Sequence, residues 1–167
     1  MRAGHMLTAA ALAAFAALLG GCGFALQGSA PLPAAVATVH LDAADDRTPF
    51  AVALRRRLAA SGAALAPRAD AAAGVAVLRI ERDELLERVA SVSARNIPRE
   101  YELTQVVRFS LDAGGVRRIS SAEVSASRSL SFDERRALAK EREREQLRET
   151  LADEVAGVVL QRVAGLR

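Results

Sequence analysis

The clearest pattern in the chain is a two-residue alternation of apolar and polar side chains in its second half. From Tyr101 to Asp112 the apolar side chains fall mainly on odd-numbered positions, with Val106 as the exception. From Val116 to Phe132 the alternation returns, and serines fill most of one side. Because successive side chains of a strand point to opposite faces of a sheet, both segments are predicted to be strands with one buried face.

Turn residues separate these segments from their neighbours. Gly114-Gly115 lies between them and predicts a hairpin, because glycine readily adopts the positive φ angles of a two-residue turn. Asn96-Ile97-Pro98 predicts a second turn ahead of Tyr101. Before that turn, Val75–Ser93 has the length and the β-branched residues of a strand, although its charged middle leaves it ambiguous. A short first strand is predicted from Val36 to Asp42, where side chains alternate again.

Two segments have the spacing of an amphipathic helix instead. The first begins with Thr48 as N-cap and Pro49 at the first helical position, where a missing N–H costs nothing, and it stops near Gly62. Its apolar side chains at four-residue intervals are Phe50, Leu54 and Leu58. The second is capped by Asp133 and runs to about Gly165. Its apolar stripe consists of Leu138, Leu147, Leu151, Val155, Val158, Val159 and Val163.

The order of these elements is β-α-β-β-β-α, which predicts an α+β fold. With the strands adjacent and antiparallel, they form a four-stranded sheet, and both helices can cover one of its faces. The opposite face, polar and rich in serine, is then left for solvent or for a partner. No repeat of this pattern is visible elsewhere in the chain.

The first residues have the organisation of a bacterial lipoprotein signal. Arg2 precedes an uncharged stretch, Met6–Leu19, and Leu19-Gly20-Gly21-Cys22 follows the pattern of a lipobox. In such a sequence the Cys22 thiol takes a diacylglyceryl group before cleavage. The alternatives are an ordinary secretory signal that contains a cysteine, and a transmembrane anchor. A transmembrane helix needs about 20 apolar residues, and Met6–Leu19 is shorter.

Cleavage before Cys22 divides the chain into three parts. Residues 1–21 are the signal peptide, residues 22–35 are the acylated cysteine and a tether containing glycine and proline, and residues 36–167 form a single α+β domain. Several acyl chains would make attachment to the membrane effectively permanent. Gly23 favours sorting to the outer membrane, since an aspartate at that position typically favours the inner membrane.

The composition excludes several kinds of chemistry. The 23 basic and 20 acidic residues nearly balance, so nucleic acid is not an expected partner. Cys22 is the only cysteine, and His40 is the only histidine after the signal, which leaves no set of residues for a catalytic triad or a histidine-rich metal site. No glycine-rich phosphate loop is present. We therefore expect no cofactor and no enzymatic activity, but a binding or assembly protein.

Several local strings resemble the lipopolysaccharide-assembly lipoprotein family, LptE. The string Cys22-Gly23-Phe24-Ala25-Leu26-Gln27-Gly28 resembles the family's mature start. Ala90-Ser91-Val92 ahead of Glu100-Tyr101 resembles the loop between its second and third strands. Phe132-Asp133 followed by Ala137-Leu138-Ala139-Lys140 resembles the start of its long final helix. The resemblance covers essentially the whole mature chain, and the order of the strings is more specific than any one of them.

This resemblance implies a location, two binding partners and a role in which no chemical reaction is catalysed. The family is tethered by lipid to the periplasmic side of the outer membrane. It forms a 1:1 complex with LptD, a large β-barrel, in which it acts as a plug and supports assembly. It also binds lipopolysaccharide while that lipid is placed in the outer leaflet. A polar serine-rich face suits the polar lumen of a barrel.

The resemblance also points to residues that would contact lipopolysaccharide. Lys140 matches the basic position of the family's A-L-A-K string. Arg95 matches the family's loop only approximately, because Ala94 can equally occupy its basic position. Arg99 lies in the same loop. Guanidinium and ammonium groups bind phosphate well, whereas ordinary solvated charges are the alternative interpretation of all three residues.

A second function remains open from the sequence. A lipoprotein can instead carry a lipid, or a lipidated protein, in an apolar cavity. That function needs a roomy pocket lined by bulky side chains. The chain contains no tryptophan and only 4% aromatic residues, which counts against such a pocket.

Overall fold

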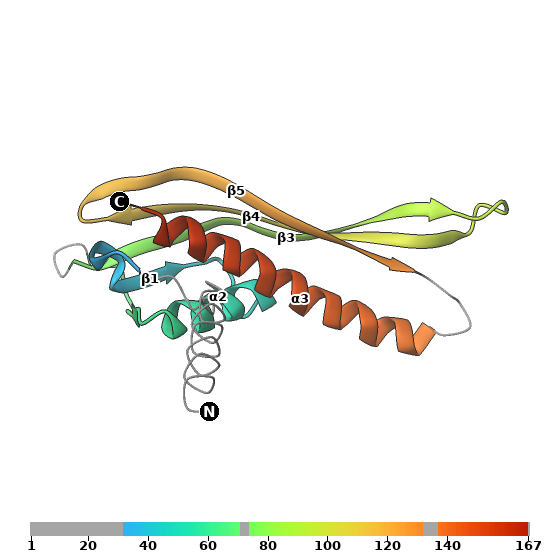
Figure 1. The fold of residues 1–167 in the computed structure, drawn as a ribbon, viewed down its shortest axis with the longest axis horizontal. Helices are drawn as coiled ribbons and strands as arrows, with labels where there is room; N and C mark the ends of the chain where they lie inside the picture. The colour runs from blue at the N-terminus through green and yellow to red at the C-terminus, as the bar shows by residue number, and fades with distance from the viewer. Residues whose placement is uncertain (1–31, 71–73, 132–136, 167) are drawn as a thin grey trace, which may run out of the picture.

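The computed structural model describes residues 32–70, 74–131 and 137–166. Their order is a 3-10 helix η1 and strand β1, helix α2, strands β2 to β5, and helix α3 (Figure 1). The bounds are η1 Ala34–Val36, β1 Thr38–Asp42, α2 Pro49–Ala60, β2 Ala64–Leu65, β3 Ala76–Val92, β4 Pro98–Ala113, β5 Val116–Ser131 and α3 Ala137–Ala164. The first strand thus starts later than predicted, because Val36 belongs to η1.

The sheet is mixed and five-stranded, in the order β2-β1-β3-β4-β5. Strand β1 runs parallel to both β2 and β3, whereas β3, β4 and β5 are antiparallel. The α+β class is confirmed, but the predicted four-stranded antiparallel sheet is wrong in two respects. A helix between two strands returns the chain to the end of the sheet where the first strand began. The next strand therefore runs parallel to the first. Strand β2 has only two residues, too few to show a period.

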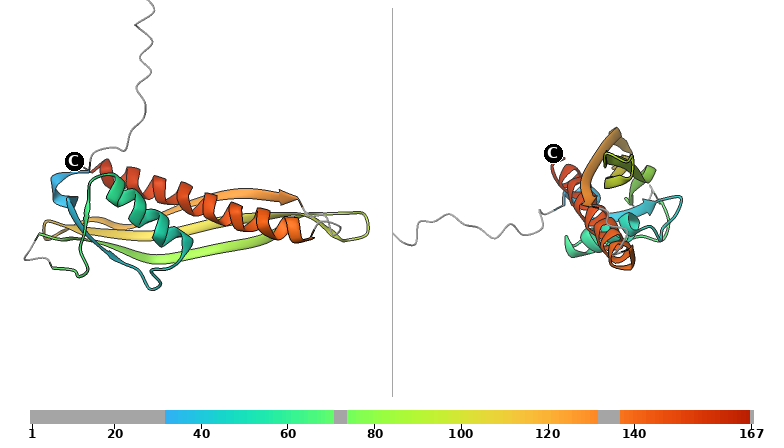
Figure 2. Two further views of the ribbon diagram at one scale, coloured as in Figure 1. Left: turned by 90° about the horizontal axis from the view of Figure 1, so that it is seen from below. Right: turned by 90° about the vertical axis from the view of Figure 1, so that its right-hand side faces the viewer.

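Both helices cover the same face of the sheet (Figures 1 and 2). On β4 the side chains of Leu103, Val107 and Phe109, at odd-numbered positions, pack in the clusters below the helices and are fully buried. On the other face the serines of β5, such as Ser125, Ser127 and Ser129, are exposed. For β4 and β5, the alternation in the sequence therefore predicts correctly which side is mainly buried.

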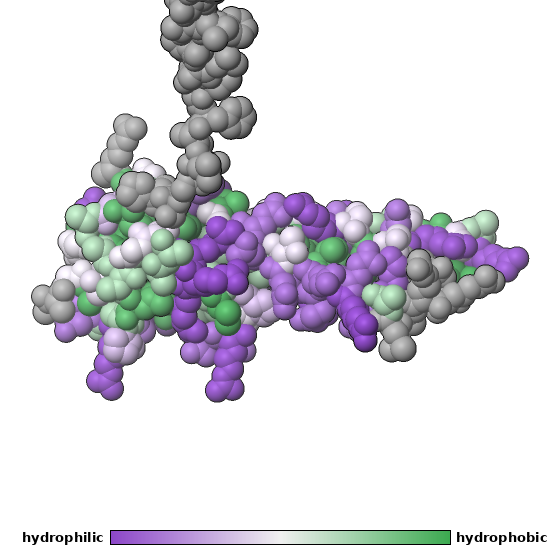
Figure 3. Space-filling model, turned by 60° about the horizontal axis from the view of Figure 1, so that its bottom comes forward, coloured by the Kyte–Doolittle hydropathy of each residue, from purple (hydrophilic) through white to green (hydrophobic). Residues whose placement is uncertain are grey.

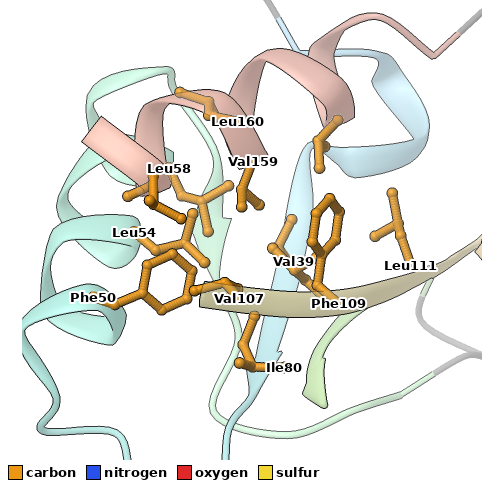
Figure 4. Packing of buried hydrophobic residues seen from close by; sticks show 14 of the residues in the cluster. Val39, Phe50, Leu54, Leu58, Ile80, Val107, Phe109, Leu111, Val159 and Leu160 are labelled. Carbon is orange, nitrogen blue, oxygen red and sulfur yellow. The ribbon is translucent and has the colours of Figure 1, made fainter. Parts of the chain in front are cut away.

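The main hydrophobic core lies where α2 and the second half of α3 pack side by side against the sheet. We call this part of the molecule the helical end. Phe50, Leu54 and Leu58 of α2 pack with residues of β4 and α3 in one cluster (Figure 4). A smaller cluster of Leu103, Leu130 and Leu151 continues the core along α3. Burial of apolar surface stabilises the fold by roughly 25 cal/mol per Å².

Local signals in the sequence correspond to observed turns and caps. The Thr48 hydroxyl accepts a hydrogen bond from the Ala51 N–H at 3.1 Å, and Pro49 is the first residue of α2. Gly114 and Gly115 have φ angles of +62° and +74°, which confirms the hairpin between β4 and β5. Asn96 has a φ of +59° in the turn between β3 and β4. The predicted cap Asp133 and the signal segment lie outside the described residues.

Strand β3 is continuous through the charged segment that was ambiguous in the sequence. Its first residues pair with both β1 and β4, but after Arg79 it pairs only with β4. Charged side chains pair with each other there, as Arg82 does with Glu84 and Arg88 with Glu102. The ribbon of β3 and β4 thus extends far from the helical end (Figure 1). We call residues 86–100 the distal hairpin.

Candidate functional site

Two of the three predicted ligand-binding cations lie on the distal hairpin. Arg95 is in its turn, and Arg99 is the second residue of β4. Both side chains are exposed, and neither forms an ion pair with any other described residue. An arginine without an acidic neighbour keeps its guanidinium donors available for an anion. These two residues therefore present guanidinium groups without an ion-pair partner among the described residues at the end of the molecule.

Lys140 has a different environment from the one predicted. Its side chain is only 15% exposed, so it is not an ordinary solvated charge. Its ammonium donates to the Glu143 carboxylate at 2.7 Å and to the Ser131 hydroxyl at 3.1 Å. These bonds tie the start of α3 to the end of β5. An anion that binds Lys140 has to compete with the Glu143 carboxylate.

The strand register brings Lys140 close to the distal hairpin. Ser131, the hydrogen-bond partner of Lys140, stands opposite Glu100 in the pairing of β4 with β5. Glu100 directly follows Arg99 in the chain. Residues forty positions apart in sequence therefore meet at one end of the molecule, because β5 returns beside β4 and α3 begins where β5 ends.

Arg144 also lies at this end of the molecule, near the base of the distal hairpin, although its sequence context does not single it out. Its guanidinium lies over the Tyr101 ring at 5.8 Å from the ring centroid. It also pairs with Glu87 of β3 at 3.1 Å and with Glu141 at 3.2 Å, and its side chain is 21% exposed. A cation over an aromatic face is attracted by the ring's quadrupole. This residue therefore holds the first half of α3 against the ribbon.

The spacing of residues along a helix is the sequence signal by which Arg144 can be identified. Lys140, Arg144, Leu147 and Leu151 are spaced at four, three and four residues, so they share one side of α3. The two leucines belong to the apolar stripe that faces the sheet. Alternating Glu and Arg in the first half of this helix are typical of a solvated surface, so the pattern does not distinguish the two cations that continue the stripe.

The surface of the molecule differs between the helical end and the rest of the molecule. On the face shown in Figure 3, hydrophobic residues gather at the helical end, and hydrophilic residues cover most of the remainder.

Within the residues that the structure describes, no helix is both long and apolar enough to cross a bilayer. The same residues contain no cluster of three or more His, Cys, Asp or Glu side chains suited to a metal ion. The arrangement supports binding of an anion through positive side chains at one end.

The fold and this cationic end define an α+β domain with exposed positive side chains at one end. A family model described as LptE, lipopolysaccharide-assembly, matches residues 36–163. The chain belongs to this family, which is the one that its local strings resemble. It is therefore a lipoprotein of lipopolysaccharide transport and outer-membrane assembly.

Solved structures of similar fold carry related descriptions. Rare lipoprotein B from Shewanella oneidensis is 28% identical, with a TM-score of 0.66, and the match covers 76% of this chain and 93% of that one. An uncharacterised lipoprotein B from Nitrosomonas europaea is 24% identical, with a TM-score of 0.69, over 85% and 90% of the two chains. A minor lipoprotein from Acinetobacter baumannii is 18% identical, with a TM-score of 0.63, over 80% and 93%. The last two likenesses show the fold alone.

Proposed function

We propose that this chain is held on the periplasmic side of the outer membrane by acyl groups on Cys22, and that it binds lipopolysaccharide at its distal end. The observation that supports binding is that Arg95, Arg99 and Lys140 all lie towards the same end of the molecule, away from the helical end. Phosphate groups on a lipid are suitable ligands for these side chains, because guanidinium and ammonium groups form charge-assisted hydrogen bonds with them. Binding of this kind requires no bond to be made or broken.

The same proposal includes a 1:1 complex with an LptD-type barrel, in which this domain acts as a plug. The serine-rich face of the sheet supports it. On that face Arg108 pairs with Glu123 at 2.7 Å, and Thr104 hydrogen-bonds to Ser127 at 2.8 Å. The charged groups are thus largely neutralised by one another, and the surface remains polar. Such a surface suits the polar interior of a large barrel.

The alternative function, a lipid carrier with an apolar cavity, has less support. One cleft of about 680 Å³ lies beside β1 and β2, and its lining mixes apolar residues with the charged Asp42, Asp45 and Asp46. A second, of about 490 Å³, lies beside α2, and Asp83 and Arg148 are in its wall. An acyl chain placed in either cleft would leave charged groups without water. These two clefts therefore do not suit an apolar cargo.

Purification of the full-length protein from its native membrane in mild detergent tests the proposal. We expect a large β-barrel protein to copurify in equal amount and lipopolysaccharide to be present in the complex. A lipidated protein in place of the barrel would support the carrier function instead. A preparation with neither barrel nor lipopolysaccharide would contradict the proposal.

A further inference from the structure

The distal hairpin exposes large apolar side chains as well as arginines. Leu86 is 46% exposed, Val89 46%, Val92 51% and Ile97 38%. These are four of the eight large apolar side chains that are exposed among the described residues. They lie within twelve consecutive positions of a ribbon that projects from the body of the molecule (Figure 1). Apolar residues also show between hydrophilic ones at this end in Figure 3.

These side chains have no visible part in stabilising the fold. No residue from Glu81 to Glu102 is buried, and the smaller hydrophobic cluster ends at Leu85 and Tyr101. Beyond these residues β3 and β4 form a ribbon without a core. Apolar side chains add little to the stability of a two-stranded ribbon in water when no other residues pack against them. Concentrated exposed apolar residues commonly mark a site of interaction instead.

The charge of the same segment indicates the kind of ligand. From Ser91 to Arg99 the chain has two arginines and no acidic residue. Arg95 and Arg99 have no ion-pair partner among the described residues. Val92 and Ile97 flank Arg95 in the sequence. The end of the hairpin is therefore both cationic and apolar, which complements a molecule that has phosphate groups next to hydrocarbon chains.

We infer that the distal hairpin inserts the side chains of Val92 and Ile97 among the acyl chains of an anionic lipid, while Arg95 and Arg99 hold its phosphates. The inference rests on the proposed function, because lipopolysaccharide is the anionic lipid in question, and it adds a contact with the hydrocarbon part. Removal of an apolar side chain from water favours binding in proportion to the area removed.

Binding to two forms of the lipid separates the apolar contact from the phosphate contact. Full-length protein in nanodiscs of phosphatidylcholine is titrated with intact lipopolysaccharide and with its fully deacylated phosphosugar. The double variant Val92→Ser with Ile97→Ser should bind intact lipopolysaccharide about tenfold more weakly or worse, since two side chains no longer leave water. It should bind the deacylated sugar as wild type does. Val92→Leu with Ile97→Leu should retain wild-type affinity for both ligands.

A matched control comes from the opposite end of the molecule. Val116, 55% exposed beside the Gly114-Gly115 turn, is equally accessible, and Val116→Ser should change neither affinity. Unchanged binding of intact lipopolysaccharide by the double serine variant would overturn the inference, as would an equal loss for both ligands. If wild type binds neither ligand, the proposed function itself fails.

Discussion

The Arg57 guanidinium of α2 and the Asp153 carboxylate of α3 join the two helices through a pair of parallel hydrogen bonds. The distance from Nε to Oδ1 is 3.0 Å, and that from Nη2 to Oδ2 is 2.5 Å. Arg56 donates to the same carboxylate at 2.8 Å. These residues are 96 and 97 positions apart in the sequence. The contact holds both helices on the same face of the sheet.

This pairing predicts a dependence of stability on pH. The Arg57 guanidinium, and then Arg56, hold the pKa of the Asp153 carboxyl below its usual value. A carboxyl whose pKa is lower in the folded state stabilises the fold above its unfolded pKa, near 4, and that stabilisation is lost as pH falls through the folded pKa. Because the Asp153 side chain is 38% exposed, we expect a contribution of no more than about 1 kcal/mol.

Urea unfolding of Asp153→Asn and of wild type between pH 3 and pH 7 measures this contribution. The difference in free energy of unfolding should be largest near neutral pH and should shrink below about pH 4. Asp45→Asn is the matched control, since Asp45 is exposed and bonds only to the nearby Arg47 N–H among the described residues. A difference for Asp153→Asn that does not change with pH would contradict the role given to this ion pair.

The Glu143 carboxylate is predicted to limit the affinity of Lys140 for an anionic lipid. Glu143→Gln removes the competing charge at 2.7 Å and should strengthen binding of lipopolysaccharide severalfold. Lys140→Gln should weaken it by about tenfold or more, because a charge-assisted hydrogen bond contributes about 1.5–3 kcal/mol. Glu145→Gln is the control, because Glu145 pairs with Arg148 at 3.5 Å and not with Lys140. Weaker binding by Glu143→Gln would show that this carboxylate positions Lys140 instead of competing for it.

The two glycines of the β4–β5 turn are predicted to be sensitive to substitution. Their positive φ angles mean that Gly114→Val together with Gly115→Val should cost about 1–3 kcal/mol at each site. Gly157 of α3 is a contrasting position, because a Cβ there would be no closer than 3.4 Å to the Arg57 guanidinium. Gly157→Ala should therefore be neutral or stabilising by up to about 1 kcal/mol, owing to the higher helix propensity of alanine. Chemical denaturation that ranks the two variants in the opposite order would contradict the turn assignment.

Acylation of the chain is predicted to depend on one side chain. Cys22→Ser replaces the thiol by a hydroxyl, which is a poor nucleophile for thioether formation. We expect an uncleaved precursor that takes up no palmitate analogue in metabolic labelling. The matched control is Ser29→Ala, a change within the same tether that leaves the thiol intact. Wild-type labelling of Cys22→Ser would exclude the lipoprotein anchor.

Local features of the fold could be predicted from the sequence, whereas long-range ones could not. Thr48, Gly114 and Gly115 act through their own backbone, so their roles follow from residue type. The partners of Asp153 depend on how α2 and α3 are placed, and no local pattern contains that information. The parallel pairing of β1 with β3 differs from the antiparallel arrangement predicted from the sequence, and the intervening helix accounts for it.

In the candidate site too, the sequence predicts individual residues but not the long-range contacts between them. Lys140 and Arg95 were identified through a family resemblance, but only the register of β5 on β4 shows that both lie at one end of the molecule. The burial of Lys140 was not predicted, since it depends on Ser131 and Glu143 together. Exposure of Val92 could not be predicted either, because an apolar residue in a strand usually indicates a buried side.

Site-specific photo-crosslinking tests most directly whether the distal hairpin binds lipopolysaccharide. A photoreactive p-benzoylphenylalanine is introduced in place of Ala94 in the exposed turn, or in place of Ala59 on the exposed side of α2 as a control. Cells producing the full-length protein are irradiated, and adducts are detected with an antibody against lipopolysaccharide. The account predicts an adduct from position 94 and none from position 59. An adduct from position 59 alone, or equal adducts from both, would contradict it.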